Sequence, residues 1–203
     1  MVRSASMRVE VFADLHADVG EAPHWDERTR TLLFVDLTAG TVFRYDRSGA
    51  KLGSFPVGQE VGAVVPRRRG GLVLAVRDGI ATVSDSGEGF ELTSPVERDI
   101  PGNRMNDAKC DPAGRLFAGT TAFDFSPHSA ALYRVESDWS FEQIVPDATQ
   151  SNGIAWSPDG GRCTSSIRPP RVSMFSTSTS APARPATGDG SSLSSARTGY
   201  LTG

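Results

Sequence analysis

Three short segments of the sequence each place an oxygen-bearing side chain beside glycine, proline or a second polar residue. They are residues 19–25 around Glu21, residues 103–109 around Asn106, and residues 150–156 around Asn152. One carboxylate and two amide oxygens form the kind of ligand set that hard cations such as calcium and magnesium prefer. Each asparagine alone is a common turn residue, so the metal interpretation requires the three segments to meet in space.

A repeat in the sequence predicts that these segments meet. Each copy of the repeat has a turn between two apolar runs, and each of these turns contains a proline. The prolines of three successive copies are Pro66, Pro112 and Pro158, spaced 46 positions apart. Apolar runs such as Leu72–Val76 have strand length, and helix periodicity is nearly absent before residue 162. A period in the forties made only of strands is typical of a β-propeller, whose innermost strands surround a central channel. A β-sandwich is the competing fold, and the regular spacing favours the propeller.

Charge and composition restrict the partners that we expect. The chain has 203 residues and a formal net charge of −3, with no basic patch suited to nucleic acid or an anionic membrane. No apolar run reaches the length of about 18 residues that a membrane-spanning helix needs. Cys110 and Cys163 form neither a metal-like cluster nor a disulfide framework. We therefore expect a cytoplasmic protein with no nucleic-acid partner and no membrane partner.

The composition changes abruptly after residue 162. Residues 163–203 hold 10 Ser and 6 Thr and carry a charge of +3, which leaves −6 for residues 1–162. We expect residues 1–162 to be an incomplete β-propeller and residues 163–203 to be an irregular tail rich in Ser, Thr, Pro and Arg. A shifted reading frame is the favoured explanation of this tail, because the change begins inside a repeat. A genuine disordered tail is the alternative.

Together, the motifs resemble those of the SMP-30/gluconolactonase/regucalcin family of six-bladed propellers, over residues from about 10 to 162. The matching segments are Gly20–Trp25 with Leu33–Asp36 after it, Arg104–Lys109, Asp111–Arg115 with Gly119–Thr120 after it, and Ser151–Gly160. Six blades of about 45 residues need about 270 residues. The expected fold is therefore an all-β propeller of the six-bladed type, truncated to about three to four blades, with an irregular C-terminal tail.

The resemblance implies metal-dependent hydrolysis of a sugar-derived lactone, with a divalent ion, calcium or zinc, in the central channel. Glu21 and Asn152 match the family's metal ligands, and Asn106 matches a position that touches metal or substrate. Arg104 matches a substrate-binding arginine, and Asp124 aligns loosely with an acidic substrate contact. The metal would act as a Lewis acid on the ring carbonyl while a carboxylate activates water.

One expected residue has no match in this sequence. The family uses a later Asp as metal ligand and catalytic base, and Asp189 lacks the strand context of that segment. We therefore assign no catalytic residue and expect the chain as given to be inactive. A non-catalytic calcium-binding propeller of the regucalcin kind is the alternative function, and a scaffold propeller for a protein partner is a third. His24 and His128 are interpreted as surface or packing residues.

Overall fold

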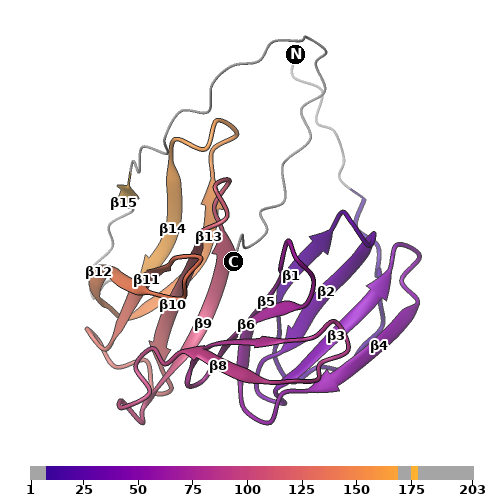
Figure 1. Cartoon of the computed structure of the whole chain (residues 1–203), viewed down its shortest axis with the longest axis horizontal. Helices are drawn as coiled ribbons and strands as arrows, with labels where there is room; N and C mark the ends of the chain where they lie inside the picture. The colour runs from indigo at the N-terminus through magenta and orange to yellow at the C-terminus, as the bar shows by residue number, and fades with distance from the viewer. Residues whose placement is uncertain (1–7, 169–174, 178–203) are drawn as a thin grey trace.

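The computed structural model describes residues 8–168 and 175–177, and every regular element among them is a β-strand. The strands form a curved array of sheets, from β1–β4 in indigo and violet to β13 and β14 in orange (Figure 1). Among the residues that the structure describes, no helix is long and apolar enough to cross a bilayer. The array matches the expected propeller architecture.

Each of the first three blades contains four antiparallel strands that pair in sequence order, and the third blade shares one sheet with the strands that follow it. The first blade contains β1 (Gly20–Asp26), β2 (Thr31–Asp36), β3 (Thr41–Asp46) and β4 (Lys51–Pro56). The second contains β5 (Val61–Pro66), β6 (Leu72–Val76), β7 (Gly79–Val83) and β8 (Glu91–Ser94). The third contains β9 (Asn103–Cys110), β10 (Leu116–Ala122), β11 (Ala130–Val135) and β12 (Phe141–Ala148).

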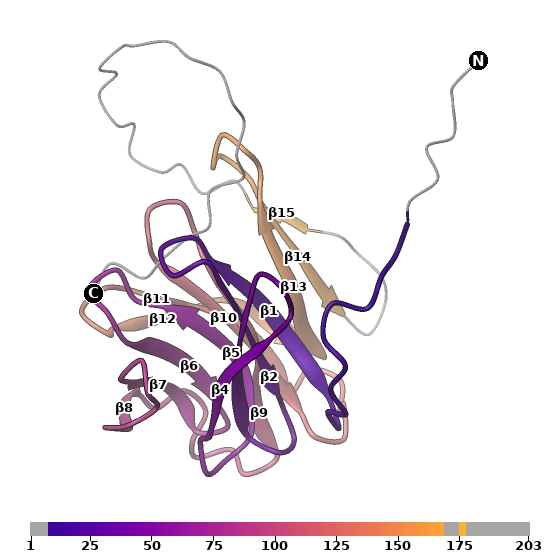
Figure 2. The ribbon, with the colours of Figure 1, turned by 90° about the vertical axis from the view of Figure 1, so that its right-hand side faces the viewer.

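Part of a fourth blade follows. It consists of β13 (Gln150–Trp156), β14 (Cys163–Arg168) and the short β15 (Phe175–Thr177), which pair in that order. A single pair, Thr121 with Gln150, connects β10 to β13. The hairpin of β13 and β14 extends from the rest of the array (Figure 2). Strand β14 therefore continues the sheet beyond residue 162, while residues 169–174 and 178–203 of the expected tail lie outside the described residues.

The repeat with a spacing of 46 residues corresponds to one turn at the same place in each blade. In the third blade this turn links β9 to β10, and the N–H of Gly114 donates to the carbonyl of Asp111 at 3.0 Å. In the fourth, Gly160 donates to Ser157 at 2.8 Å. Gly114 and Gly160 have φ of +86° and +71°, a conformation that glycine adopts without strain. The glycine after each repeat proline is therefore required by the backbone.

The hydrophobic cores lie between neighbouring blades rather than within one sheet. One core joins the first blade to the second and contains Leu33, Val35 and Leu74, and another joins the second to the third through Val73, Met105 and Leu116. Because side chains alternate across a strand, Leu74 and Val73 face opposite blades. A third core, built from Phe117, Leu132, Ile154 and Cys163, joins the third blade to β13 and β14.

The innermost strands lie next to one another around the axis. Strand β1 packs beside β5, β5 beside β9, and β9 beside β13. This arrangement brings the beginnings of β1, β9 and β13 together, although they are far apart in sequence. These are the segments that carry Glu21, Asn106 and Asn152.

Candidate metal centre

Each innermost strand contains a β-bulge near its beginning. The register shifts between Glu21 and His24 in β1, between Val61 and Ala63 in β5, and between Asn152 and Ile154 in β13. In β9 the extra residues are Asn106 and Asp107, opposite Gly119 of β10. A bulge turns side chains out of the regular alternation, and bulges are frequent beside active sites. All three predicted metal residues lie at or beside such a bulge.

The backbone at two of these bulges is left-handed. Ala22 has φ of +49°, and Gly153 has φ of +62°. Glycine adopts this conformation freely, whereas alanine does so at a cost of about 1 kcal/mol or more. Ala22 packs against both cores on either side of the second blade, and this packing holds the strained residue in place.

A cavity of about 330 Å³ lies between the bulges of β1, β9 and β13. Its lining includes Glu21 and His24 from β1, Asp107 and Lys109 from β9, and Asn152 from β13. Two of the three predicted metal residues, Glu21 and Asn152, therefore share one cavity. Glu21 is exposed and Asn152 half-buried, so solvent reaches both side chains.

Asn106 lies beside this cavity but does not line it. Its side chain is 7% exposed, its Nδ2 donates to the carbonyl of Ser151 at 3.0 Å, and its Oδ1 accepts from Nη1 of Arg104 at 2.9 Å. Both ends of the amide are thus engaged within the protein. This arrangement links Asn106 to the strand that carries Asn152.

Arg104, a predicted substrate-binding residue, contacts Asn106 and does not line the cavity. Its guanidinium lies 5.8 Å from the centre of the Phe123 ring and donates to the carbonyl of Met105 at 3.0 Å. Burial lowers the pKa of the guanidinium, while the carboxylates of Glu60 and Glu21 oppose this shift. The arginine therefore remains a cation beside the Glu21 end of the cavity.

Asp124 lies on the exposed loop between β10 and β11 and does not line the cavity. Its carboxylate accepts hydrogen bonds from the hydroxyl and the N–H of Ser126, at 2.7 and 3.0 Å. These bonds lower the pKa of Asp124. The structure thus places Arg104 and Asn106 in direct contact on β9, whereas none of Arg104, Asn106 and Asp124 lines the cavity.

Sequence reasoning missed Asp107 as a site residue. Its Oδ2 accepts from the backbone N–H of Gly153 at 2.9 Å and of Ile154 at 3.3 Å, so it connects β9 to the bulge of β13. The sequence does contain a sign of this role, because Asp107 directly follows the candidate site residue Asn106. An aspartate beside a bulged asparagine can reach the neighbouring strand, but only the register of the two blades shows that it does.

His24 was interpreted as a surface or packing residue, and the structure shows that it is buried in the cavity wall. It is 8% exposed, and its Nε2 has no hydrogen-bond partner among the described residues. Burial lowers the pKa of His24 to about 4, with Lys109 acting in the same direction and Asp26 opposing. The imidazole is therefore neutral at pH 7.

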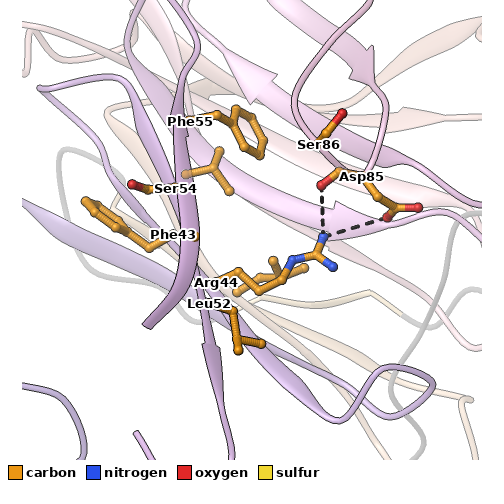
Figure 3. Close-up of a pocket in the computed structure, with 10 residues that line it drawn as sticks. Phe43, Arg44, Leu52, Ser54, Phe55, Asp85 and Ser86 are labelled. Carbon is orange, nitrogen blue, oxygen red and sulfur yellow. Dashed lines mark hydrogen bonds and ion pairs between the residues drawn. The ribbon is translucent and has the colours of Figure 1, made fainter. Parts of the chain in front are cut away.

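A second cavity, of about 250 Å³, lies at the outer side of the first two blades and has a different chemistry. Arg44 reaches across it to Asp85, with its Nη2 3.4 Å from the backbone oxygen and 3.7 Å from the carboxylate (Figure 3). Phe43 and Phe55 supply aromatic walls. This cavity contains none of the predicted site residues.

The donors of the first cavity suit a hard divalent cation, but they are few. Glu21 offers a carboxylate and Asn152 an amide oxygen, and calcium prefers 6–8 oxygen ligands. Across the described ranges 8–168 and 175–177, no group of three or more His, Cys, Asp or Glu is placed to hold a metal ion. The chemistry fits a metal, and the ligand set on these residues is partial.

Comparisons with known proteins agree with this fold. The family model described as the SMP-30/Gluconolactonase/LRE-like region matches residues 19–165. The regucalcin of Danio rerio is 37% identical over 157 residues, which cover 76% of this chain and 53% of the relative. The regucalcin of Xenopus laevis is 34% identical over 160 residues, covering 76% and 54%.

Solved structures are similar to this chain in fold. A luciferin-regenerating enzyme has a TM-score of 0.69 and 33% identity, with coverage of 73% of this chain and 52% of its own. A gluconolactonase from Xanthomonas campestris has a TM-score of 0.63 and 21% identity, with coverage of 81% and 60%. The chain spans about half the length of the curated relatives that it matches. The match of the family model over most of the described strands shows that the chain belongs to the SMP-30/Gluconolactonase/LRE-like family.

Proposed function

We propose that the cavity between β1, β9 and β13 binds a divalent cation through Glu21 and Asn152, as part of a lactone-hydrolysing propeller. One observation carries this proposal. Glu21 and Asn152 are 131 positions apart in the sequence, yet both line the same cavity. The matching family model is described as the SMP-30/Gluconolactonase/LRE-like region, which supports a lactone as the substrate class. A sugar-derived lactone is the specific substrate that we propose.

Calcium suits this site better than zinc. The proposed ligands are oxygen atoms, which calcium prefers, whereas zinc favours nitrogen and sulfur. A bound cation would supply Lewis-acid polarisation of the lactone carbonyl. Arg104 would orient the substrate as a fixed cation, with Asn106 holding the arginine and Asp124 contacting hydroxyl groups from its loop.

A calcium-binding propeller without catalysis is the second candidate. A solved relative from Agrobacterium tumefaciens is described as a calcium-binding protein, regucalcin, although at 23% identity its likeness to this chain supports the fold alone. The partial ligand set of the described residues favours binding without turnover for this chain. We therefore expect the purified 203-residue chain to show no metal-dependent lactone hydrolysis, and detectable hydrolysis would contradict that expectation.

The test of the metal site is calorimetric titration of Ca²⁺ and Zn²⁺ into the purified chain and its variants. Glu21→Gln removes the carboxylate while keeping the shape, so we expect calcium affinity to fall at least about tenfold. Glu91→Gln is the matched control, because it removes one negative charge from an exposed position on β8. Equal affinity in the wild type and the Glu21 variant would refute the metal site and both metal-dependent functions. Repeating the Glu21 change in a propeller of full family length, with hydrolysis of a sugar lactone as the readout, then separates the lactonase from the calcium binder.

A further inference from the structure

We propose that Asp107 is a positioning residue for Asn152, because it accepts the backbone N–H groups of the two residues that follow Asn152. This inference rests on the proposed metal site, in which Asn152 is a ligand. Asp107 lines the same cavity, and its Oδ2 accepts two backbone N–H groups of β13.

The backbone N–H of Gly153 has two acceptors. It lies 2.9 Å from Oδ2 of Asp107 and 3.0 Å from Oδ1 of Asn152. The Asn152 oxygen is the atom that a cation would bind, and an amide oxygen has a second lone pair for an ion. Asp107 and the proposed ligand are therefore connected through one backbone N–H.

Asp107 holds the backbone on the C-terminal side of Asn152. A carboxylate is a strong acceptor, and Oδ2 of Asp107 accepts from the N–H groups of Gly153 and Ile154. Without the carboxylate, these two N–H groups would lose their acceptor on β9, and the bulge that presents Asn152 would be held less tightly. Ordering Asn152 around a cation would then cost more conformational entropy.

Asn106 holds the other side of Asn152. Its Nδ2 donates to the carbonyl of Ser151 at 3.0 Å, while Asp107 accepts from Gly153. Two consecutive residues of β9 thus fix the residues before and after Asn152, across the boundary between the third and fourth blades. The left-handed φ of +62° at Gly153 presents its N–H toward β9 in this arrangement.

The competing explanation is that Asp107 acts through its charge, as a cation ligand. Two substitutions separate the explanations. Asp107→Asn removes the charge but keeps an oxygen that can accept from Gly153, whereas Asp107→Ala removes both. Asp107→Ser, whose side chain is too short to span to Gly153, replaces the alanine variant if that variant fails to fold.

The experiment combines calcium titration calorimetry with amide hydrogen exchange of the purified chain. For positioning, we expect Asp107→Ala to lower calcium affinity about tenfold or more, and Asp107→Asn to remain within about threefold of the wild type. Exchange at Gly153 and Ile154 should accelerate in the alanine variant and stay slow in the asparagine variant. Ser94→Ala is the matched control, because the Ser94 hydroxyl donates to Trp139 across another blade boundary, at 2.7 Å.

Each outcome decides the proposal. An equal loss of affinity in both Asp107 variants would assign the effect to charge and overturn positioning. An equal loss in Ser94→Ala would assign it to general packing, with the same consequence. If the wild type binds no cation, the proposed metal site fails, and the exchange at Gly153 still shows whether Asp107 holds the bulge.

Discussion

Gly62 of β5 lies directly against the carbonyl group of Asn106 of β9. A Cβ atom at position 62 would overlap the oxygen and carbon of that carbonyl. Both atoms belong to backbone, so no flexible side chain can move aside to make room. The second and third blades can therefore approach this closely at the cavity only because residue 62 has no side chain.

We predict that Gly62→Ala destabilises the chain by about 1–3 kcal/mol, because β5 and β9 must separate to admit the methyl group. The measurement is urea unfolding of the purified chain. Gly53→Ala is the matched control in β4, where a Cβ would meet no atom within 4 Å. We expect the control to change the unfolding free energy by less than about 1 kcal/mol. Equal stability of the two variants would refute the tight approach of β5 and β9.

His24 should make the stability of the chain depend on pH. Its pKa is near 6.5 in the unfolded chain and about 4 in the folded chain, so the unfolded state binds more protons between these values. The free energy of unfolding contributed by His24 is therefore fully present above pH 6.5 and is lost as the pH falls through 4. The size of the effect is about 3 kcal/mol at most.

His24→Gln isolates this contribution, because glutamine is polar and does not titrate. We predict that the stability difference between the wild type and the variant shrinks, or reverses, between pH 7 and pH 4.5. Carboxylates titrate in both proteins, so their contribution cancels in the difference. Parallel stability curves for the two proteins over this range would show that His24 is not buried as a neutral group.

Phe117 should hold the β13–β14 hairpin against the third blade. Its ring is 2% exposed and lies 5.1 Å from the ring of Trp156 in an edge-to-face arrangement. We predict that Phe117→Ala costs about 3–5 kcal/mol locally, through the lost contacts and the cavity left behind. The β13–β14 hairpin should then open more often than the first three blades.

The rates at which the two cysteines react with a thiol reagent report this opening. Cys163 is 2% exposed in the core beneath Phe117, while Cys110 is 3% exposed in the core between the second and third blades. Burial raises the pKa of both thiols, so the wild type should react slowly with a thiol reagent at pH 7. In Phe117→Ala, Cys163 should react at least about tenfold faster, with little change at Cys110. Equal acceleration at both cysteines would indicate global unfolding instead.

The repeat and its turns could be predicted from the sequence because they follow from local chemistry. The spacing of Pro66, Pro112 and Pro158 identifies the turns, and the observed hydrogen bonds at Gly114 and Gly160 lie in them. The all-β propeller of three to four blades is confirmed by the pairing of β1 to β14 and by the family match. The assignment of ligand and substrate roles to Glu21, Asn106, Asn152, Arg104 and Asp124 stays a prediction.

The extent of the fourth blade depends on pairing rather than composition. Residues 163–168 are rich in Ser and Thr, which led us to place the tail boundary at residue 162. In the structure, Cys163 and Ile167 pack in the core that joins the third blade to the β13–β14 hairpin. Their strand, β14, pairs with β13. Two apolar side chains at alternating positions are enough to extend the sheet when a partner strand is already present.

The sequence by itself determined the strand-and-turn repeat and the presence of Glu21 and Asn152 near the beginnings of innermost strands. Those features depend on neighbours along the chain, where turn chemistry and alternation act. Only the tertiary structure decided that Asp107 and Asn106 hold the bulge of β13, that His24 is buried in the cavity wall, and that Gly62 must lack a side chain. Each of these depends on the distance between blades, which is set by the packing of cores between sheets and leaves no local pattern in the sequence.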